Sequence, residues 1–249
     1  MERLPDAVEL LDGPLDDPDA LVGNLRDLRR MNRALGGVRL SRLAIDRLLD
    51  GAAKRREPHR TEVESAGREL SLLDVGTGGA DIPVALLADA RRRGRPMRIV
   101  AIDSRPEIVA AASIARPGIA HCRGLLLDVG NGDSLPYPEA AFDVVHCSLV
   151  LHHHGPRDAV ALLAEMARVA RLGIVVNDLA RGRLAWLGAA TIATLLTPNR
   201  YTRHDAPLSV RRAYTLAEVG GLLADAGLRP VAEIGGIFGH RFAIAAVPR

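Results

Sequence analysis

A short apolar run leads directly into a glycine-rich turn at Leu72–Pro83, with the sequence LLDVGTGGADIP. Glycine allows backbone conformations that other residues avoid and lets the chain approach a ligand closely. A helix should start just after the turn, with Asp81 as its N-cap and Pro83 in its first turn. Exposed amides at such a helix start suit a polar or anionic ligand group. The segment therefore predicts a strand, a ligand-binding loop and a helix in succession.

Strand-like and helix-like patterns alternate along the chain from residue 70 onwards. Alternation of this kind favours a mostly parallel sheet with helices on both faces. The last two strand candidates are joined by a glycine-rich segment too short for a crossover helix, so they should pair antiparallel. We expect strands at 70–75, 98–102, 124–127, 142–148, 173–176, 231–234 and 241–247, and helices at 82–93, 105–115, 156–170 and 215–226.

Three regions stand outside this alternation. Residues 1–50 place apolar side chains at three- and four-residue steps, which is typical of helices. Residues 51–69 are charged with few apolar positions, so we expect a linker or exposed loop. An insertion at about 179–214 is expected to form a helical lid over the carboxyl ends of the strands, where open α/β sheets bind ligands. The predicted domains are a helical cap and linker at 1–69 and a core with its lid at 70–249.

The charge pattern argues against a nucleic-acid partner. The formal net charge is +3, and only 3% of the residues are aromatic. The densest basic run, Arg91–Arg93, sits at an expected helix end, where cations favour the helix dipole, and no aromatic residues accompany it. The N-terminus lacks the apolar stretch of a signal peptide, and the longest apolar run, Leu184–Leu196, is too short to span a bilayer. We expect a cytoplasmic protein that binds neither nucleic acid nor membrane.

The glycine turn does not fit a dinucleotide fingerprint, because Asp81 stands where the third glycine belongs. It resembles instead the first motif of class I S-adenosylmethionine-dependent methyltransferases, D-x-G-x-G-x-G, and departs from it only at Ala80. The resemblance implies a Rossmann-like, seven-stranded sheet with an antiparallel last strand, and S-adenosylmethionine as cofactor. The cofactor-binding residues that it implies here are Asp74, Gly76, Thr77, Gly78 and Asp81.

An acidic residue ends the second expected strand, at Asp103. A carboxylate in this place accepts hydrogen bonds from both hydroxyls of a ribose, and it matches the second motif of the same methyltransferases. The alternative role is a helix N-cap before Pro106, which the neighbouring Ser104 could fill instead. We expect Asp103 and Ser104 to contact the cofactor.

The segment from Leu127 to Pro138, followed by Phe142-Asp143-Val144-Val145, resembles small-molecule methyltransferases similar to the ubiquinone and menaquinone C-methyltransferases. In that family an acid binds the adenine amino group and the next residue contacts the ring. Counting from the strand end puts Asp128 at the acid's place, with Val129 after it, whereas counting back from Leu135-Pro136 puts Asn131 there. Either side chain has an oxygen that can accept from the amino group, and Asp128 is favoured.

Three consecutive histidines, His152 to His154, follow the fourth expected strand and Ser148. A similar stretch in the family faces the methyl donor or lines the active site, so we expect Ser148 to bind cofactor and His152 and His153 to be catalytic candidates. Neighbouring residues on a strand or helix point apart, so no metal site is expected. His204 and Asp205 in the lid form a second candidate pair, a base with its orienting acid; the alternative is a loop salt bridge.

The resemblance implies methyl transfer to a small organic acceptor, with S-adenosyl-L-homocysteine as product. The flanks resemble a bacterial subgroup that accompanies polyketide and phenolic pathways, which favours an O-methyltransferase of secondary metabolism. The leucine- and alanine-rich lid favours an apolar or aromatic acceptor. C-methylation of a quinol-like acceptor is the alternative. Two alternatives of another functional class are a non-catalytic S-adenosylmethionine-binding protein and a nicotinamide oxidoreductase. The oligomeric state is left open, a dimer included.

Overall fold

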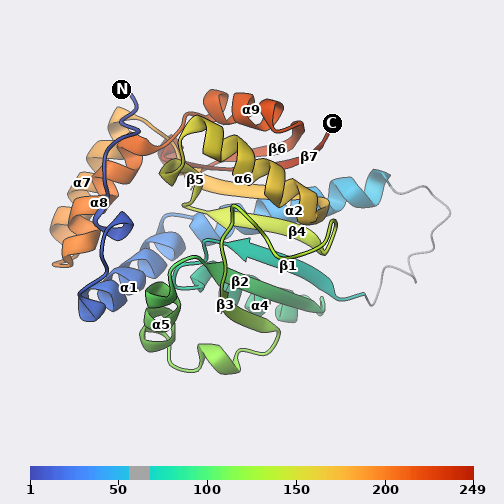
Figure 1. Ribbon diagram of the computed structural model, residues 1–249, viewed down its shortest axis with the longest axis horizontal. Coiled ribbons are helices and arrows are strands. Elements are labelled where there is room, and N and C mark those ends of the chain that lie inside the picture. The colour runs from blue at the N-terminus through green and yellow to red at the C-terminus, as the bar shows by residue number, and fades with distance from the viewer. Residues whose placement is uncertain (56–67) are drawn as a thin grey trace.

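The computed structural model describes residues 1–55 and 68–249. Seven strands form one sheet in the order β3-β2-β1-β4-β5-β7-β6 (Figure 1). The first five strands along the chain are parallel to one another, and β7 runs antiparallel to both of its neighbours, β5 and β6. The predicted Rossmann-like sheet is therefore confirmed. The strands are β1 (Leu70–Val75), β2 (Met97–Asp103), β3 (Leu125–Val129), β4 (Phe142–Ser148), β5 (Ala170–Leu179), β6 (Leu228–Gly235) and β7 (Arg241–Pro248).

Helices cover both faces of this sheet because successive strand residues point to opposite sides. Leu72 belongs to a core formed with α2 (Gly37–Arg55) and α4 (Asp81–Arg92). Leu73, next along β1, belongs to the opposite core, formed with α6 (Pro156–Val169) and α9 (Leu216–Asp225). The first residues of the stretch expected as a linker, 51–55, are thus helical, residues 56–67 lie outside the described residues, and residues 68–69 precede β1 without regular structure.

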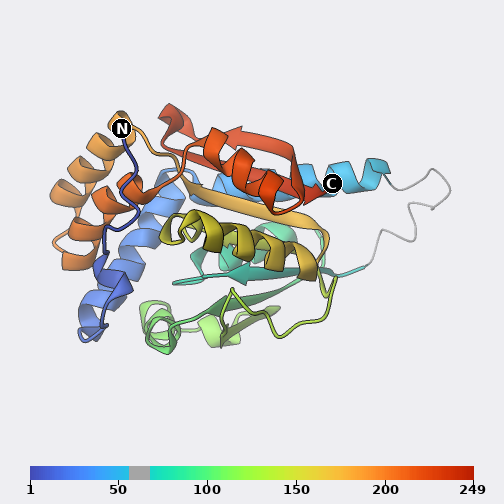
Figure 2. The same ribbon diagram turned by 45° about the horizontal axis from the view of Figure 1, so that its top comes forward.

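A second group of helices gathers beyond the carboxyl ends of the parallel strands (Figures 1 and 2). Helix α1 (Pro18–Ala34) packs on α5 (Pro106–Ala115) and on α8 (Arg200–Arg212), and α7 (Arg183–Leu196) packs on α8. Leu21, Leu25, Ala111 and Tyr201 form the shared apolar core of α1, α5 and α8. The insertion between β5 and α9 therefore folds as the two helices α7 and α8, which lie with α1 above the strand ends.

The start of α4 corrects one detail of the sequence analysis. Ala80, not Asp81, precedes the helix as its N-cap, and Ala80 itself takes the left-handed conformation with φ 48°. The turn closes through the Ala80 amide, which donates to the Thr77 carbonyl, and this places Asp81 inside the first helical turn. A carboxylate there still favours the helix dipole. Ala80 itself therefore takes the conformation for which the motif usually has a glycine.

Within residues 1–55 and 68–249, no helix is both long and apolar enough to cross a membrane.

Candidate active site

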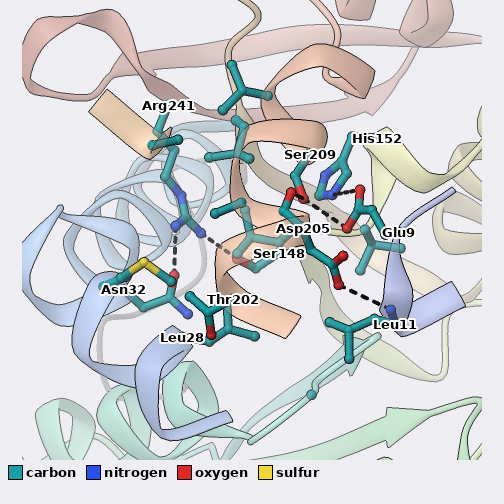
Figure 3. A pocket seen from close by; sticks show the side chains of 18 of the residues that line it. Glu9, Leu11, Leu28, Asn32, Ser148, His152, Thr202, Asp205, Ser209 and Arg241 are labelled. Atoms are coloured by element: carbon teal, nitrogen blue, oxygen red, sulfur yellow. Dashed lines mark hydrogen bonds and ion pairs between the residues drawn. The ribbon is translucent and has the colours of Figure 1, made fainter. Parts of the chain in front are cut away.

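A cavity of about 930 Å³ lies between the strand ends and the helices above them. Ligand pockets range over roughly 300–1,000 Å³, so this one is large for a single small ligand. Its walls come from α1, the glycine turn after β1, the ends of β2 and β4, the lid helices α7 and α8, and an N-terminal segment with the short helix η1 (Leu10–Asp12). Polar side chains gather at two ends of it (Figure 3).

The glycine turn forms the floor of one end. Gly76 has φ +65°, and a Cβ atom there would lie 2.4 Å from Val150 Cγ2, so no other residue fits without displacing a neighbour. The Thr77 hydroxyl oxygen is buried and lacks a hydrogen-bond partner among the described residues. Gly76, Thr77 and Gly78 all line the cavity. A close-approach turn with an unsatisfied polar atom fits the polar portion of a bound cofactor.

Asp103 lies at the edge of this turn, at the end of β2. Its carboxylate accepts hydrogen bonds from the Gly78 amide at 3.0 Å and the Arg105 amide at 3.1 Å. Burial raises the pKa of Asp103 above its usual value, against the lowering effect of these two amides. Asp103 and Ser104 both line the cavity. The carboxylate is thus held in place, with remaining acceptor capacity for ligand hydroxyls.

Three predicted cofactor residues lie away from the cavity wall. Asp128 and Val129 at the end of β3 and Asn131 after it are all exposed, and none of them lines the cavity. The Asn131 side chain accepts from the Asp133 amide at 3.0 Å, as a turn residue does. The Asp128 side chain likewise accepts from the Val129 amide at 2.8 Å, so the geometry does not separate the two, and the adenine role of either stays a prediction.

Asp74 is buried beneath the turn and does not line the cavity. It bonds to the Nδ1 atom of His146, a fully buried histidine of β4 whose Nε2 atom bonds the Ser41 hydroxyl at 2.8 Å. The structure therefore gives Asp74 a supporting contact from below the turn rather than a direct contact with the cavity.

Arg241, which the sequence analysis missed, reaches the cavity from the start of β7. Its guanidinium donates to the side-chain oxygens of Asn32 and Ser148, at 2.7 Å each, and of Asn177, at 2.6 Å. Asn32 in turn donates to Asp81 at 3.2 Å. Ser148, a predicted cofactor residue, thus lies in a polar group beside the glycine turn (Figure 3).

His152 lies at the other polar end of the cavity. Its Nδ1 atom lies 2.7 Å from the Asp178 carboxylate, which also accepts from the His152 amide at 3.1 Å. Both residues are about 2% exposed. Although burial favours the neutral acid, the histidine lowers the pKa of Asp178 below its usual value. The pair fixes the imidazole ring with its Nδ1 atom on Asp178 and its Nε2 atom on the side of Glu9.

The free Nε2 atom of His152 faces Glu9, 3.8 Å away, on the N-terminal segment. Burial raises the pKa of Glu9. The Glu9 carboxylate accepts from the Ser209 hydroxyl at 2.9 Å and from Arg212 at 3.3 Å. At this end of the cavity, His152 therefore lies between two carboxylates, those of Asp178 and Glu9, and Arg212 pairs with Glu9.

His153 lies against His152, with ring centroids 4.2 Å apart. The expectation that neighbouring histidines point apart is wrong for this pair, because Asp12 holds the His153 Nδ1 atom at 3.0 Å and turns the ring back. Ligand atoms of Glu9, His152 and His153 lie within 4.8 Å of one another. Arg212 already contacts both Glu9 and Asp12, so an arginine supplies positive charge beside this cluster, and the absence of a metal stays a prediction.

The His204 Nδ1 atom lies 2.8 Å from the Asp205 carboxylate, but the two side chains have different surroundings. Asp205 is buried and accepts from the amides of Leu10 and Leu11 at 2.8 and 3.1 Å, which ties η1 to α8. The His204 side chain is 45% exposed and does not line the cavity. The geometry favours an anchoring role for Asp205 and no direct role for His204.

The comparisons with known proteins agree with this arrangement. A family model for a methyltransferase domain matches residues 73–176, the span from the glycine turn to β5. An uncharacterized methyltransferase of Synechocystis sp. is 28% identical over 102 residues, which make up 41% of this chain and 42% of that relative. The chain thus matches less than half the length of this relative.

Solved structures share the fold. A SAM-dependent methyltransferase from Aquifex aeolicus aligns with a TM-score of 0.52 and 20% identity over 79% of this chain and 96% of that one. An O-methyltransferase family 2 protein from Planctomyces limnophilus, solved with apigenin, aligns with a TM-score of 0.60 and 20% identity over 96% of this chain and 64% of that one. Residues 73–176 therefore form a methyltransferase domain, and the sheet has the fold of a solved S-adenosylmethionine-dependent methyltransferase.

Proposed function

We propose that this protein transfers a methyl group from S-adenosylmethionine to a hydroxyl of a small apolar or aromatic acceptor, as an O-methyltransferase of a phenolic or polyketide-type compound. The observation that carries the proposal is the buried His152–Asp178 pair, which opens into an otherwise largely apolar cavity. A role in the secondary metabolism of the cytoplasm fits this chemistry and is part of the proposal.

The cofactor belongs at the end of the cavity formed by the glycine turn. Asp103 would hold the ribose hydroxyls, Gly76 and Gly78 would let the backbone lie against the ligand, and the Thr77 hydroxyl would find the partner that it lacks. Asp128 would receive the adenine amino group. When bound, the cofactor presents a methyl group that its positive sulfonium already activates.

The histidine end serves the acceptor. A phenol has a pKa near 10, so removal of its proton by a positioned base accelerates attack by roughly 10²–10⁴-fold. His152 accepts that proton at Nε2, and Asp178 holds the ring and stabilises its positive charge from the Nδ1 side. Closure of the cavity by α7, α8 and η1 keeps water away and aligns the acceptor, a positioning effect of up to roughly 7–11 kcal/mol.

The apolar walls support an apolar acceptor. Helix α1 contributes Leu25, Leu28 and Met31 to the cavity, its C-cap Leu35 adds another leucine, and α7 contributes only leucine, isoleucine, alanine and glycine. Between these walls, the Asn24 side-chain oxygen is buried without a partner among the described residues, so it can accept one hydrogen bond from the acceptor. The solved relative that binds apigenin, a phenolic compound, is consistent with this class of acceptor.

The test is an acceptor panel with methyl-labelled S-adenosylmethionine. Phenols, quinols and carboxylic acids are incubated with the protein, and products are identified by mass spectrometry and by the position of the label. Methyl ethers of phenols are expected. Label on ring carbon would replace the proposal with C-methylation of a quinol-like acceptor, and absence of any transfer by protein that binds S-adenosylhomocysteine would favour a non-catalytic binding protein.

A further inference from the structure

The Arg241 guanidinium is fully buried, yet its three hydrogen-bond partners are the neutral side chains of Asn32, Ser148 and Asn177. No carboxylate of the described residues lies within salt-bridge distance of it. A guanidinium carries five N–H donors. Three of these are used, which leaves one N–H on each of the two terminal nitrogens for a further acceptor.

A second buried arginine, Arg212, lies close to the cavity wall at Glu9 and differs from Arg241 in having carboxylate partners. Arg212 contacts the carboxylates of both Glu9 and Asp12. Burying a charge is costly unless it is paired, and burial lowers the pKa of Arg241 to about 10, against the raising effects of the more distant Asp178 and Asp81. Arg241 therefore lacks the counter-ion that Arg212 has, at a place where it lines a ligand cavity.

The position of Arg241 relative to the glycine turn is defined by its partners. Cys147 pairs with Val75 in the sheet, so Ser148 and Gly76, the next residues, lie side by side at neighbouring strand ends. Arg241 donates to Ser148, and this puts its charge beside the turn on the β4 side. Asp103 lies on the β2 side, across β1. A ligand that has its ribose at Asp103 and crosses the turn reaches Arg241 with its other end.

A buried polar chain holds the guanidinium in place. Arg241 donates to the Asn177 oxygen, the Asn177 amide donates to the Ser41 hydroxyl at 2.7 Å, and Ser41 bonds His146, which bonds Asp74. Each side chain in this series is hydrogen-bonded to the next, so the Arg241 side chain is restrained in one position. The fixed position is that of a preorganised anion site.

We propose that Arg241 binds the α-carboxylate at the amino-acid end of S-adenosylmethionine, an inference that rests on the proposed function. The cofactor carries this carboxylate at the end opposite its adenine, where the geometry above places Arg241. Charge-assisted hydrogen bonds to carboxylate are stronger than neutral ones, and both free N–H groups of the guanidinium would be used.

The test compares two ligands that differ in this carboxylate. S-adenosylhomocysteine has it, whereas 5′-methylthioadenosine lacks the whole amino-acid end. Isothermal titration of both into the full chain and into Arg241→Gln should show S-adenosylhomocysteine weakened by about 10- to 100-fold, and methylthioadenosine changed by less than about threefold. Arg241→Lys, which keeps the charge, should recover part of the loss.

Gly37→Ala provides a variant that keeps the arginine. A Cβ atom there would lie 2.7 Å from Arg241 Nη1 and 2.7 Å from Asn32 Oδ1, so it should displace the guanidinium and weaken S-adenosylhomocysteine selectively as well. Arg181→Gln is the matched control, since its side chain is largely buried and paired with Glu218 away from the cavity wall. It should leave the affinity for both ligands unchanged.

The outcomes separate the two claims. Equal weakening of both ligands in Arg241→Gln, or no change in either, would overturn the assignment of the carboxylate to Arg241 while leaving the proposed function intact. An unchanged affinity for S-adenosylhomocysteine with a lost affinity for a carboxylated acceptor would also overturn it. Failure of the wild-type chain to bind S-adenosylhomocysteine would overturn the proposed function, and the inference with it. Thermal unfolding of each variant shows whether it is folded.

Discussion

The two polar ends of the cavity are both buried, yet they differ in how their charges are balanced. At the histidine end, Arg212 is paired with Glu9, and His152 with Asp178. At the glycine end, Arg241 has neutral partners only, and the Thr77 hydroxyl has no partner among the described residues. The arginine of the histidine end thus has carboxylate partners, although its Nε atom lacks an acceptor among the described residues, whereas the arginine of the glycine end has no carboxylate partner at all.

This difference fits separate functions for the two ends, with the cofactor bound at the glycine end and the acceptor at the histidine end. A site that holds a charged, polar cofactor gains affinity by leaving groups unsatisfied until the ligand arrives. A site that removes a proton from an apolar acceptor needs its base already oriented before the acceptor binds. The contrast predicts that substitutions at the histidine end lower the rate of methyl transfer, whereas substitutions at the glycine end lower the affinity for the cofactor.

His152→Ala should have the largest effect on rate. Loss of the base should lower the rate of methyl transfer by roughly 10²–10⁴-fold, while the affinity for S-adenosylhomocysteine stays within about threefold. Single-turnover rates with an acceptor from the panel, together with titration of S-adenosylhomocysteine, measure both quantities. A variant that loses cofactor affinity and keeps its rate would reverse the assignment of the two ends.

Asp178→Asn should lower the rate somewhat less than removal of the histidine. The asparagine can donate to Nδ1 and so favours the wrong tautomer of His152, an effect that reaches about 10⁴-fold in serine proteases. Removing one partner of a buried pair also destabilises the fold, by about 3–5 kcal/mol. A variant with unchanged rate would show that the pair is only structural.

The same variant carries a pH signature. The pKa of Asp178 lies below its usual value, so its ionised form stabilises the folded state at all pH values above the unfolded pKa of about 3.9. That contribution is lost as the pH falls through the lower folded value. The difference in unfolding free energy between wild type and Asp178→Asn should therefore be constant at neutral and mildly acidic pH and shrink below about pH 4. Urea unfolding at several pH values measures it.

Asp205→Ala tests whether the N-terminal segment belongs to the acceptor end. Loss of two buried hydrogen bonds from the amides of Leu10 and Leu11 should lower the free energy of unfolding by about 1–3 kcal/mol. It should also lower the rate, because Glu9 is no longer held against His152, and leave the affinity for S-adenosylhomocysteine unchanged. Urea unfolding and titration distinguish this result from a loss at the glycine end.

His204→Ala should have the smallest effect. Its side chain is half exposed and lies outside the cavity wall, and exposed surface substitutions usually change stability by less than about 0.5 kcal/mol. We expect a rate within about twofold of wild type, since no group near the acceptor is altered. A loss comparable to that of His152→Ala would restore the His204–Asp205 pair as the base.

The features that the sequence predicts well are contiguous. The glycine turn, the alternation of strands and helices, and the short link before β7 lie within a few residues of the groups that define them, so local pattern was sufficient for the sheet and its last strand. Local pattern also identified His152 and His153 as candidates, but the contact with Asp178 that distinguishes His152 depends on the arrangement of the strands.

The features that it missed join distant segments. Glu9 and Arg212 are 203 residues apart, and Asn32 and Arg241 are 209 apart. The local sequence around a single arginine before a strand, or around a single glutamate near the N-terminus, does not indicate a partner about 200 residues away. The N-cap of α4 was missed for another reason: an alanine in the left-handed conformation, held by the closed turn, is rare for a residue with a side chain.

The measurement that tests the account most directly is calorimetric titration of S-adenosylhomocysteine into the wild-type chain and into Asp103→Ala, with NADH as the competing ligand. We predict that wild type binds S-adenosylhomocysteine and not NADH, and that the substitution weakens binding by at least about tenfold, because the ribose hydroxyls lose their acceptor. Well-folded wild-type protein that binds only NADH, or neither ligand, would contradict the assignment of the glycine end to S-adenosylmethionine.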